Sequence, residues 1–164
     1  MDGSKKMVSK AKATLRGDNF TFIQKTFEDY ISSEGESLKY DMVFSSNAIH
    51  HLTLIGKSKM YSRIFHELTN GGLFINIDVV MPPSERIEDW EFRMWVDWIN
   101  ETLVRNNQND EIGKYDGVPK NYKDAHENKP DDLFEQLELL RKIGFKNVEC
   151  FYKYGIFTMF GGTK

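Results

Sequence analysis

Two adjacent histidines, His50 and His51, follow a short polar run at positions 45–47. The preceding residues, 40–46, include a central Met-Val-Phe run that predicts a strand buried on both faces. Histidine is the side chain best suited to exchange protons near neutral pH. The two cannot both face inward on a strand, but in a loop entering a helix one could reach a ligand crevice and act as a base. The alternative is that it caps a helix or packs.

A metal site is not predicted. His50, His51 and His66 lack a carboxylate or thiol at ligand spacing, and His126 lies in a polar segment where a lone histidine is usually solvated. Cys150 is the only cysteine, so an intrachain disulfide is impossible and a cytoplasmic setting is expected.

Composition narrows the class of protein. Hydrophobic residues make up 40% and charged residues 29%, which are ordinary globular values and argue against low-complexity disorder. The net charge is −3, and no run of Lys and Arg is long enough to follow a phosphate backbone, so nucleic acid is not an expected partner. No apolar stretch reaches the roughly 20 residues that span a bilayer, so no membrane partner is expected.

Hydrophobic periodicity predicts alternating helices and strands. Helices are expected over 4–16, 26–33, 57–69, 84–106 and 130–143, and strands over 20–24, 40–46, 73–80, 148–154 and 156–160. The segment 107–129 has no clear period and is predicted to be a loop or lid. This order predicts an α/β fold with a largely parallel sheet, closed by an antiparallel strand at the carboxy-terminal edge.

Several segments, taken in order, resemble the class I S-adenosylmethionine-dependent methyltransferases. YDMVFSSNAIHHL (40–52) is similar to that family's fourth strand and following loop, and FHELTNGGLFIN (65–76) to its helix, glycine turn and fifth strand. LLRKIGFKNV (139–148) resembles its last helix and sixth strand, and 152–164 a seventh strand. The resemblance implies a single, partial Rossmann-like methyltransferase domain over 1–164, with 81–130 as a substrate-side insertion or lid.

The amino terminus, MDGSKKMV, resembles the end of the family's second strand. There, a carboxylate accepts hydrogen bonds from ribose hydroxyls, and Asp2 matches that position. The family's first strand and glycine-rich turn would precede Asp2, and no such segment is present. We therefore expect either a fragment of a longer gene product, or a shortened protein that completes its sheet by strand exchange in a homodimer.

The resemblance also implies contacts to S-adenosylmethionine. Thr26 stands near the position where the family usually has an aspartate for the adenine amino group, with Glu28 or Asp29 as alternatives. The expected cofactor contacts are Asp2, Thr26, Phe27, Ser45, Ser46 and Asn47. Trp90, Trp95 and Tyr122 are expected to line an acceptor pocket, with core packing as the alternative for the tryptophans.

The predicted function is methyl transfer from S-adenosylmethionine to a small-molecule acceptor, with His50 or His51 as the base. The alternative is a catalytically silent methyltransferase-like fragment or interaction subunit that cannot hold cofactor alone. A nicotinamide-dependent dehydrogenase is disfavoured, because the sequence has neither a glycine fingerprint nor a Tyr-x-x-x-Lys pair. The identity of the acceptor does not follow from the sequence.

Overall fold

The computed structural model describes residues 1–17, 19–33 and 39–164. The chain divides into two compact units, Met1–Leu38 and Lys39–Lys164, and each is described by itself. One domain over 1–164, with 81–130 as an insertion, stays a prediction.

The unit Met1–Leu38 contains two helices, α1 (Lys5–Thr14) and α2 (Phe27–Ser32). Both begin at a hydroxyl that accepts a hydrogen bond from a backbone N–H of the first turn, Ser4 in α1 and Thr26 in α2. Both helices were predicted.

The predicted strand over 20–24 is wrong. Only Gln24 pairs, in an isolated bridge with Asp2, and two backbone hydrogen bonds of 3.1 and 3.2 Å hold that bridge. Aromatic and β-branched residues favour a strand, but a strand also needs a ladder of partners, which the described residues do not supply here.

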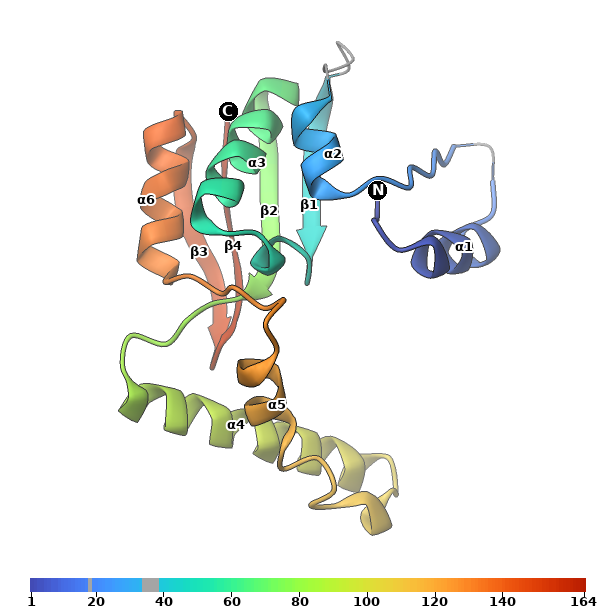
Figure 1. The fold of residues 1–164 in the computed structure, drawn as a ribbon, viewed down its shortest axis with the longest axis vertical. Coiled ribbons are helices and arrows are strands. Elements are labelled where there is room, and N and C mark those ends of the chain that lie inside the picture. The colour runs from blue at the N-terminus through green and yellow to red at the C-terminus, as the bar shows by residue number, and fades with distance from the viewer. Residues whose placement is uncertain (18, 34–38) are drawn as a thin grey trace. The chain divides into compact units, whose positions relative to one another are not determined.

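The unit Lys39–Lys164 is built on a four-stranded sheet of order β1-β2-β4-β3 (Figure 1). The strands are β1 (Tyr40–Ser46), β2 (Leu68–Val79), β3 (Lys146–Tyr154) and β4 (Phe157–Thr163). β1 and β2 are parallel, and β4 is antiparallel to both β2 and β3. The predicted Rossmann-like class is confirmed.

The place of the antiparallel strand differs from the expectation, because β4 lies between β2 and β3 and not at the edge. Gly155, at φ +54°, turns the chain from β3 into β4. Gly161 then allows β4 to approach β2 closely, since a Cβ at that position would lie 1.9 Å from the Phe74 carbonyl oxygen.

Helices α3 (Leu54–Glu67) and α6 (Leu133–Ile143) lie along the sheet, whereas α4 (Glu85–Arg105) and α5 (Val118–Asp124) lie beyond the ends of the strands (Figure 1). Short 3-10 turns, η1 (Ile49–His51) and η2 (Asn109–Glu111), complete the unit. The predicted helix 84–106 is confirmed, with Ser84 and Asn106 as its caps. The segment 107–129 is not a plain loop, because α5 lies within it.

None of the described helices is long and apolar enough to cross a bilayer. The core lies on the face of the sheet that carries Phe74, Asn76 and Asp78, alternate residues of β2 that are all buried. Phe74 packs against Tyr61 and Phe145, with ring centroids 5.5 and 5.8 Å away. The other two residues are polar and must find partners inside the protein.

Candidate functional site

A buried histidine–carboxylate pair lies where the two parallel strands end. His50 follows β1 in η1, and Asp78 is the next-to-last residue of β2. His50 Nδ1 lies 2.5 Å from Asp78 Oδ1, and the His50 backbone N–H donates to Asp78 Oδ2 at 3.0 Å. The side chains are only 8% and 3% exposed. Pairing with a carboxylate puts the proton on Nδ1, which leaves Nε2 free to accept one.

Asp78 is held from several sides. Its Oδ1 accepts from the Val79 backbone N–H at 3.0 Å, and its Oδ2 lies 3.5 Å from Asn76 Nδ2. The negative charge of Asp78 also affects the pKa of two tyrosines. Burial first, then Asp78, raises the pKa of the Tyr122 hydroxyl well above its usual value. Burial, then Asp78 and Asp131, raises the pKa of Tyr61 in the same direction. Both tyrosines therefore stay protonated hydrogen-bond donors.

His51 has a different environment from its neighbour. It is exposed, its Nδ1 lies 3.0 Å from the Glu127 carbonyl oxygen, and its ring centroid is 4.1 Å from that of His50. No carboxylate orients it among the described residues. Of the two histidines proposed from the sequence, the geometry of a general base favours His50.

The segment between α5 and α6 is tied to the histidine turn by a buried lysine. Lys57, 1% exposed, donates to the Lys129 carbonyl oxygen at 2.5 Å and forms an ion pair with Asp131. The Lys129 backbone N–H in turn donates to the His50 carbonyl oxygen at 2.9 Å. These contacts hold the chain that follows α5 against the turn that carries His50.

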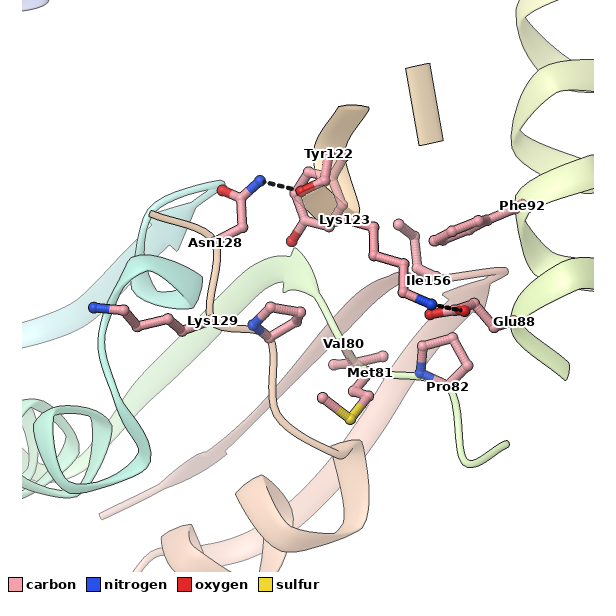
Figure 2. A pocket seen from close by; sticks show the side chains of 11 residues that line it. Val80, Met81, Pro82, Glu88, Phe92, Tyr122, Lys123, Asn128, Lys129 and Ile156 are labelled. Atoms are coloured by element: carbon pink, nitrogen blue, oxygen red, sulfur yellow. Dashed lines mark hydrogen bonds and ion pairs between the residues drawn. The ribbon is translucent and has the colours of Figure 1, made fainter. Parts of the chain in front are cut away.

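A cavity of about 310 Å³ lies beside this segment (Figure 2). Tyr122 connects it to the histidine, because the Tyr122 ring lines the cavity and its centroid is 6.0 Å from that of His50. The Tyr122 hydroxyl is buried and has no hydrogen-bond partner among the described residues. The other lining residues are Val80, Met81, Pro82, Glu88, Phe92, Lys123, Asn128, Lys129, Pro130 and Ile156.

The three residues expected to bind the acceptor do not all come together. Tyr122 lines the cavity, and Trp95 meets its ring edge-on at 5.8 Å. Trp95 also packs against Phe157 at 5.1 Å. Trp90 is 54% exposed and borders a separate groove, formed with Arg86, Ile87 and Arg93.

The residues expected to bind the cofactor lie in both units. Ser46 and Asn47 are exposed and Ser45 is half-buried at the carboxyl end of β1, where parallel strands commonly present ligand-binding groups. Asn47 is in the left-handed region, at φ +47°, and its backbone N–H donates to the Ile77 carbonyl oxygen at 2.8 Å.

Asp2, Thr26 and Phe27 belong to the unit Met1–Leu38. Asp2 Oδ1 accepts from the Ser4 backbone N–H at 2.7 Å, and Thr26 Oγ1 from the Asp29 N–H at 3.1 Å. Each retains a lone pair for a further donor, so these groups fit the hydroxyls and amino groups of a nucleoside. Phe27 is half-buried at the start of α2.

Asp78, Lys57 and Asp131 were not singled out from the sequence. Asp78 carried a usable signal, because it is the one charged residue in the apolar run LFINIDVV. A carboxylate within a buried strand needs a partner, and His50 is that partner. Lys57 and Asp131 gave no comparable signal, since charged residues at helix starts and in loops are usually solvated.

No protein-family model and no curated protein matches the chain. Solved structures are similar to it at low sequence identity. Human N-acetylserotonin methyltransferase in complex with SAM is 15% identical with a TM-score of 0.58, and the match covers 99% of this chain and 39% of that one. An O-methyltransferase family protein from Burkholderia thailandensis is 13% identical with a TM-score of 0.53, covering 88% of this chain and 35% of that one.

A third similar structure is described as a pericyclic reaction enzyme, at 11% identity and a TM-score of 0.55, covering 99% of this chain and 35% of that one. The chain thus spans between a third and two fifths of the length of these structures. The parallel β1–β2 pair and the antiparallel β4 agree with the segments matched from the sequence. The chain therefore has the class I S-adenosylmethionine-dependent methyltransferase fold.

Proposed function

We propose that this chain forms the acceptor-side part of an S-adenosylmethionine-dependent methyltransferase that acts on a small molecule, with His50 as its general base. One observation carries the proposal, namely the buried His50–Asp78 pair at the carboxyl edge of the parallel strands. Such a pair is what deprotonation of an acceptor hydroxyl requires: an imidazole with a free nitrogen, oriented by a carboxylate.

When bound, the cofactor would supply a methyl group on a sulfonium, so that an acceptor oxygen could bond to the methyl carbon in line while the sulfur leaves as the thioether of S-adenosylhomocysteine. The protein has to align the acceptor, exclude water and remove a proton. In our proposal His50 Nε2 takes the proton of the acceptor hydroxyl. Asp78 keeps Nδ1–H in place and stabilises the positive charge that His50 then carries.

Contacts to the cofactor are part of the same proposal. Ser45, Ser46 and Asn47 would bind its methionine end from the carboxyl end of β1. Asp2 would accept from the ribose hydroxyls, and Thr26 and Phe27 would contact the adenine. The exposure of Ser46, Asn47, Asp2 and Thr26, and the lone pairs left on the last two, support these roles.

A second candidate is a catalytically silent methyltransferase-like subunit. Met42 and Phe44 on β1 are 52% and 57% exposed, and no described strand pairs with the outer edge of β1. An apolar edge strand of this kind favours association, which includes strand exchange between two copies. The fold alone does not decide between the candidates, because one fold supports many reactions.

The test is isothermal titration of the protein with S-adenosylhomocysteine, followed by a transfer assay with radiolabelled S-adenosylmethionine. We expect saturable one-to-one binding, weakened in the Ser46→Ala/Asn47→Ala double variant and unchanged in His50→Gln. A folded protein that does not bind S-adenosylhomocysteine would overturn the proposal. Non-binding together with a stable dimer in light scattering would support the silent subunit.

A further inference from the structure

The cavity beside α5 is mostly apolar. Its walls come from the chain after β2 (Val80, Met81, Pro82), from Phe92 on α4 and from Ile156 in the β3–β4 turn. Figure 2 shows these side chains around one space. At about 310 Å³ it is at the lower end of the range of small-molecule pockets. The cavity therefore fits a small and largely apolar molecule.

The charged groups at the cavity are already paired or directed elsewhere. Lys123 forms an ion pair with Glu88, and this contact raises the pKa of Lys123. The Lys129 ammonium group points away from the cavity in Figure 2, and its backbone is bonded to His50 and Lys57. No unpaired charge among these residues faces the cavity, so its lining offers no partner to a charged ligand and an uncharged one is favoured.

The Tyr122 hydroxyl is the buried polar atom of this lining that lacks a partner. Leaving a buried hydroxyl unpaired is unfavourable, and a ligand oxygen that accepts its hydrogen bond would remove this cost. The residue is also held in position. Its carbonyl oxygen accepts from Asn128 Nδ2 at 2.8 Å, and the Trp95 ring meets its ring at 73°. A fixed donor without a partner, in an apolar cavity, is a recognition element for an oxygen.

We infer that Tyr122 is the positioning residue for the acceptor, and that the acceptor is a small, uncharged, largely apolar molecule whose oxygen accepts a hydrogen bond from the Tyr122 hydroxyl. The inference rests on the proposed function and narrows its substrate class. The ring centroids of Tyr122 and His50 are 6.0 Å apart, so the residue that would hold the acceptor is a neighbour of the proposed base. The pKa of Tyr122, raised by burial, keeps its hydroxyl a donor through neutral pH.

The test compares phenol with toluene, two probes of similar size that differ by the hydroxyl. Binding is followed by NMR shifts of the Val80 and Ile156 methyl groups, which line the cavity. We expect phenol to bind more tightly than toluene. Tyr122→Phe should weaken phenol binding about tenfold, or about 1.4 kcal/mol, and leave toluene binding unchanged. Tyr115→Phe, at an exposed tyrosine outside the cavity lining, is the matched control and should change neither.

Equal binding of phenol and toluene, or unchanged phenol binding in Tyr122→Phe, would overturn the inference. Because probe binding is measured without methyl transfer, a negative result here can be told apart from a failure of the proposed function. If Tyr122→Phe changes neither cofactor binding nor methyl transfer, the proposed function stands and the positioning role of Tyr122 is ruled out. For a methylated acceptor, a positioning role requires Tyr122→Phe to act mainly on KM, whereas His50→Gln acts on kcat.

Discussion

Two groups of polar residues in this molecule are held in contrasting ways. In the first group, the side chains of His50 and Lys57 are buried, and each has a carboxylate partner far away in the sequence, Asp78 for His50 and Asp131 for Lys57. In the unit Met1–Leu38, Asp2 and Thr26 are exposed, and their side chains bind backbone groups two or three residues away. The groups that would handle the proton thus depend on tertiary packing, while those that would bind the nucleoside depend on local capping. Substitutions in the two groups should therefore differ in kind.

The largest effect is expected at the histidine pair. His50→Gln should reduce methyl transfer about 1000-fold, because the group that we propose to accept the proton is lost. The matched control is His51→Gln, whose ring is exposed and has no described carboxylate partner. Rates are measured with radiolabelled S-adenosylmethionine. A similar loss of transfer rate in both variants would contradict the choice of His50, rather than His51, as the base.

The next effect concerns stability. Lys57→Met should lower the free energy of unfolding by about 3 kcal/mol, because the Asp131 carboxylate and the Lys129 carbonyl oxygen lose their donor. Urea denaturation measures the change. Lys114→Met, which removes an exposed ion pair with Glu111, should cost under about 1 kcal/mol. Equal costs would mean that the lysine in the buried group is no more important to the fold than a surface lysine.

Alkaline pH should lower the free energy of unfolding through the buried Tyr61. The pKa of Tyr61 is raised by burial, so above about pH 10 the unfolded chain releases this proton first and the free energy of unfolding falls. The expected slope is up to about 1.4 kcal/mol per pH unit for this tyrosine. In Tyr61→Phe this contribution should disappear, as measured by urea denaturation between about pH 9 and 11. The same slope in Tyr61→Phe as in the unmodified protein would contradict the raised pKa of Tyr61.

The smallest effect is expected in the amino-terminal unit. Thr26→Ala removes the cap of α2 and should cost about 1 kcal/mol in the local stability of that helix, detectable by hydrogen exchange. It should also weaken S-adenosylhomocysteine binding several-fold, without changing urea denaturation of the sheet. A large loss of global stability would show that this unit is not governed by local capping.

Local signals in the sequence predicted much of the fold. The strand 40–46 was found from its central Met-Val-Phe run, but its predicted burial on both faces is wrong, because Met42 and Phe44 are 52% and 57% exposed. The helix 84–106 was found because its residues carry a clear period and caps at both ends. The position of β4 between β2 and β3 was not found, since strand pairing depends on contacts distant in the sequence. Helix α5 was missed because its seven residues are too few to show a period.

The candidate site, like the fold, has parts that could be predicted from local sequence and parts that could not. His50 was a candidate because its residue type and its place after a strand can be read locally. Its partner Asp78 lies 28 positions away, and only the parallel register of β1 and β2 brings the two together. The role of Tyr122 was proposed from its segment, but its unpartnered hydroxyl depends on the packing of α5 and the chain around it.

The central claim is that Asp78 holds His50 with Nε2 free to take a proton. Long-range proton–nitrogen NMR of the imidazole, with His50→Gln to assign the signal, tests it without knowledge of the acceptor. We expect the proton of neutral His50 on Nδ1, directed to Asp78, and a shift of this balance in Asp78→Asn. A proton found on Nε2 in the unmodified protein would contradict the claim, because His50 could then not act as the base.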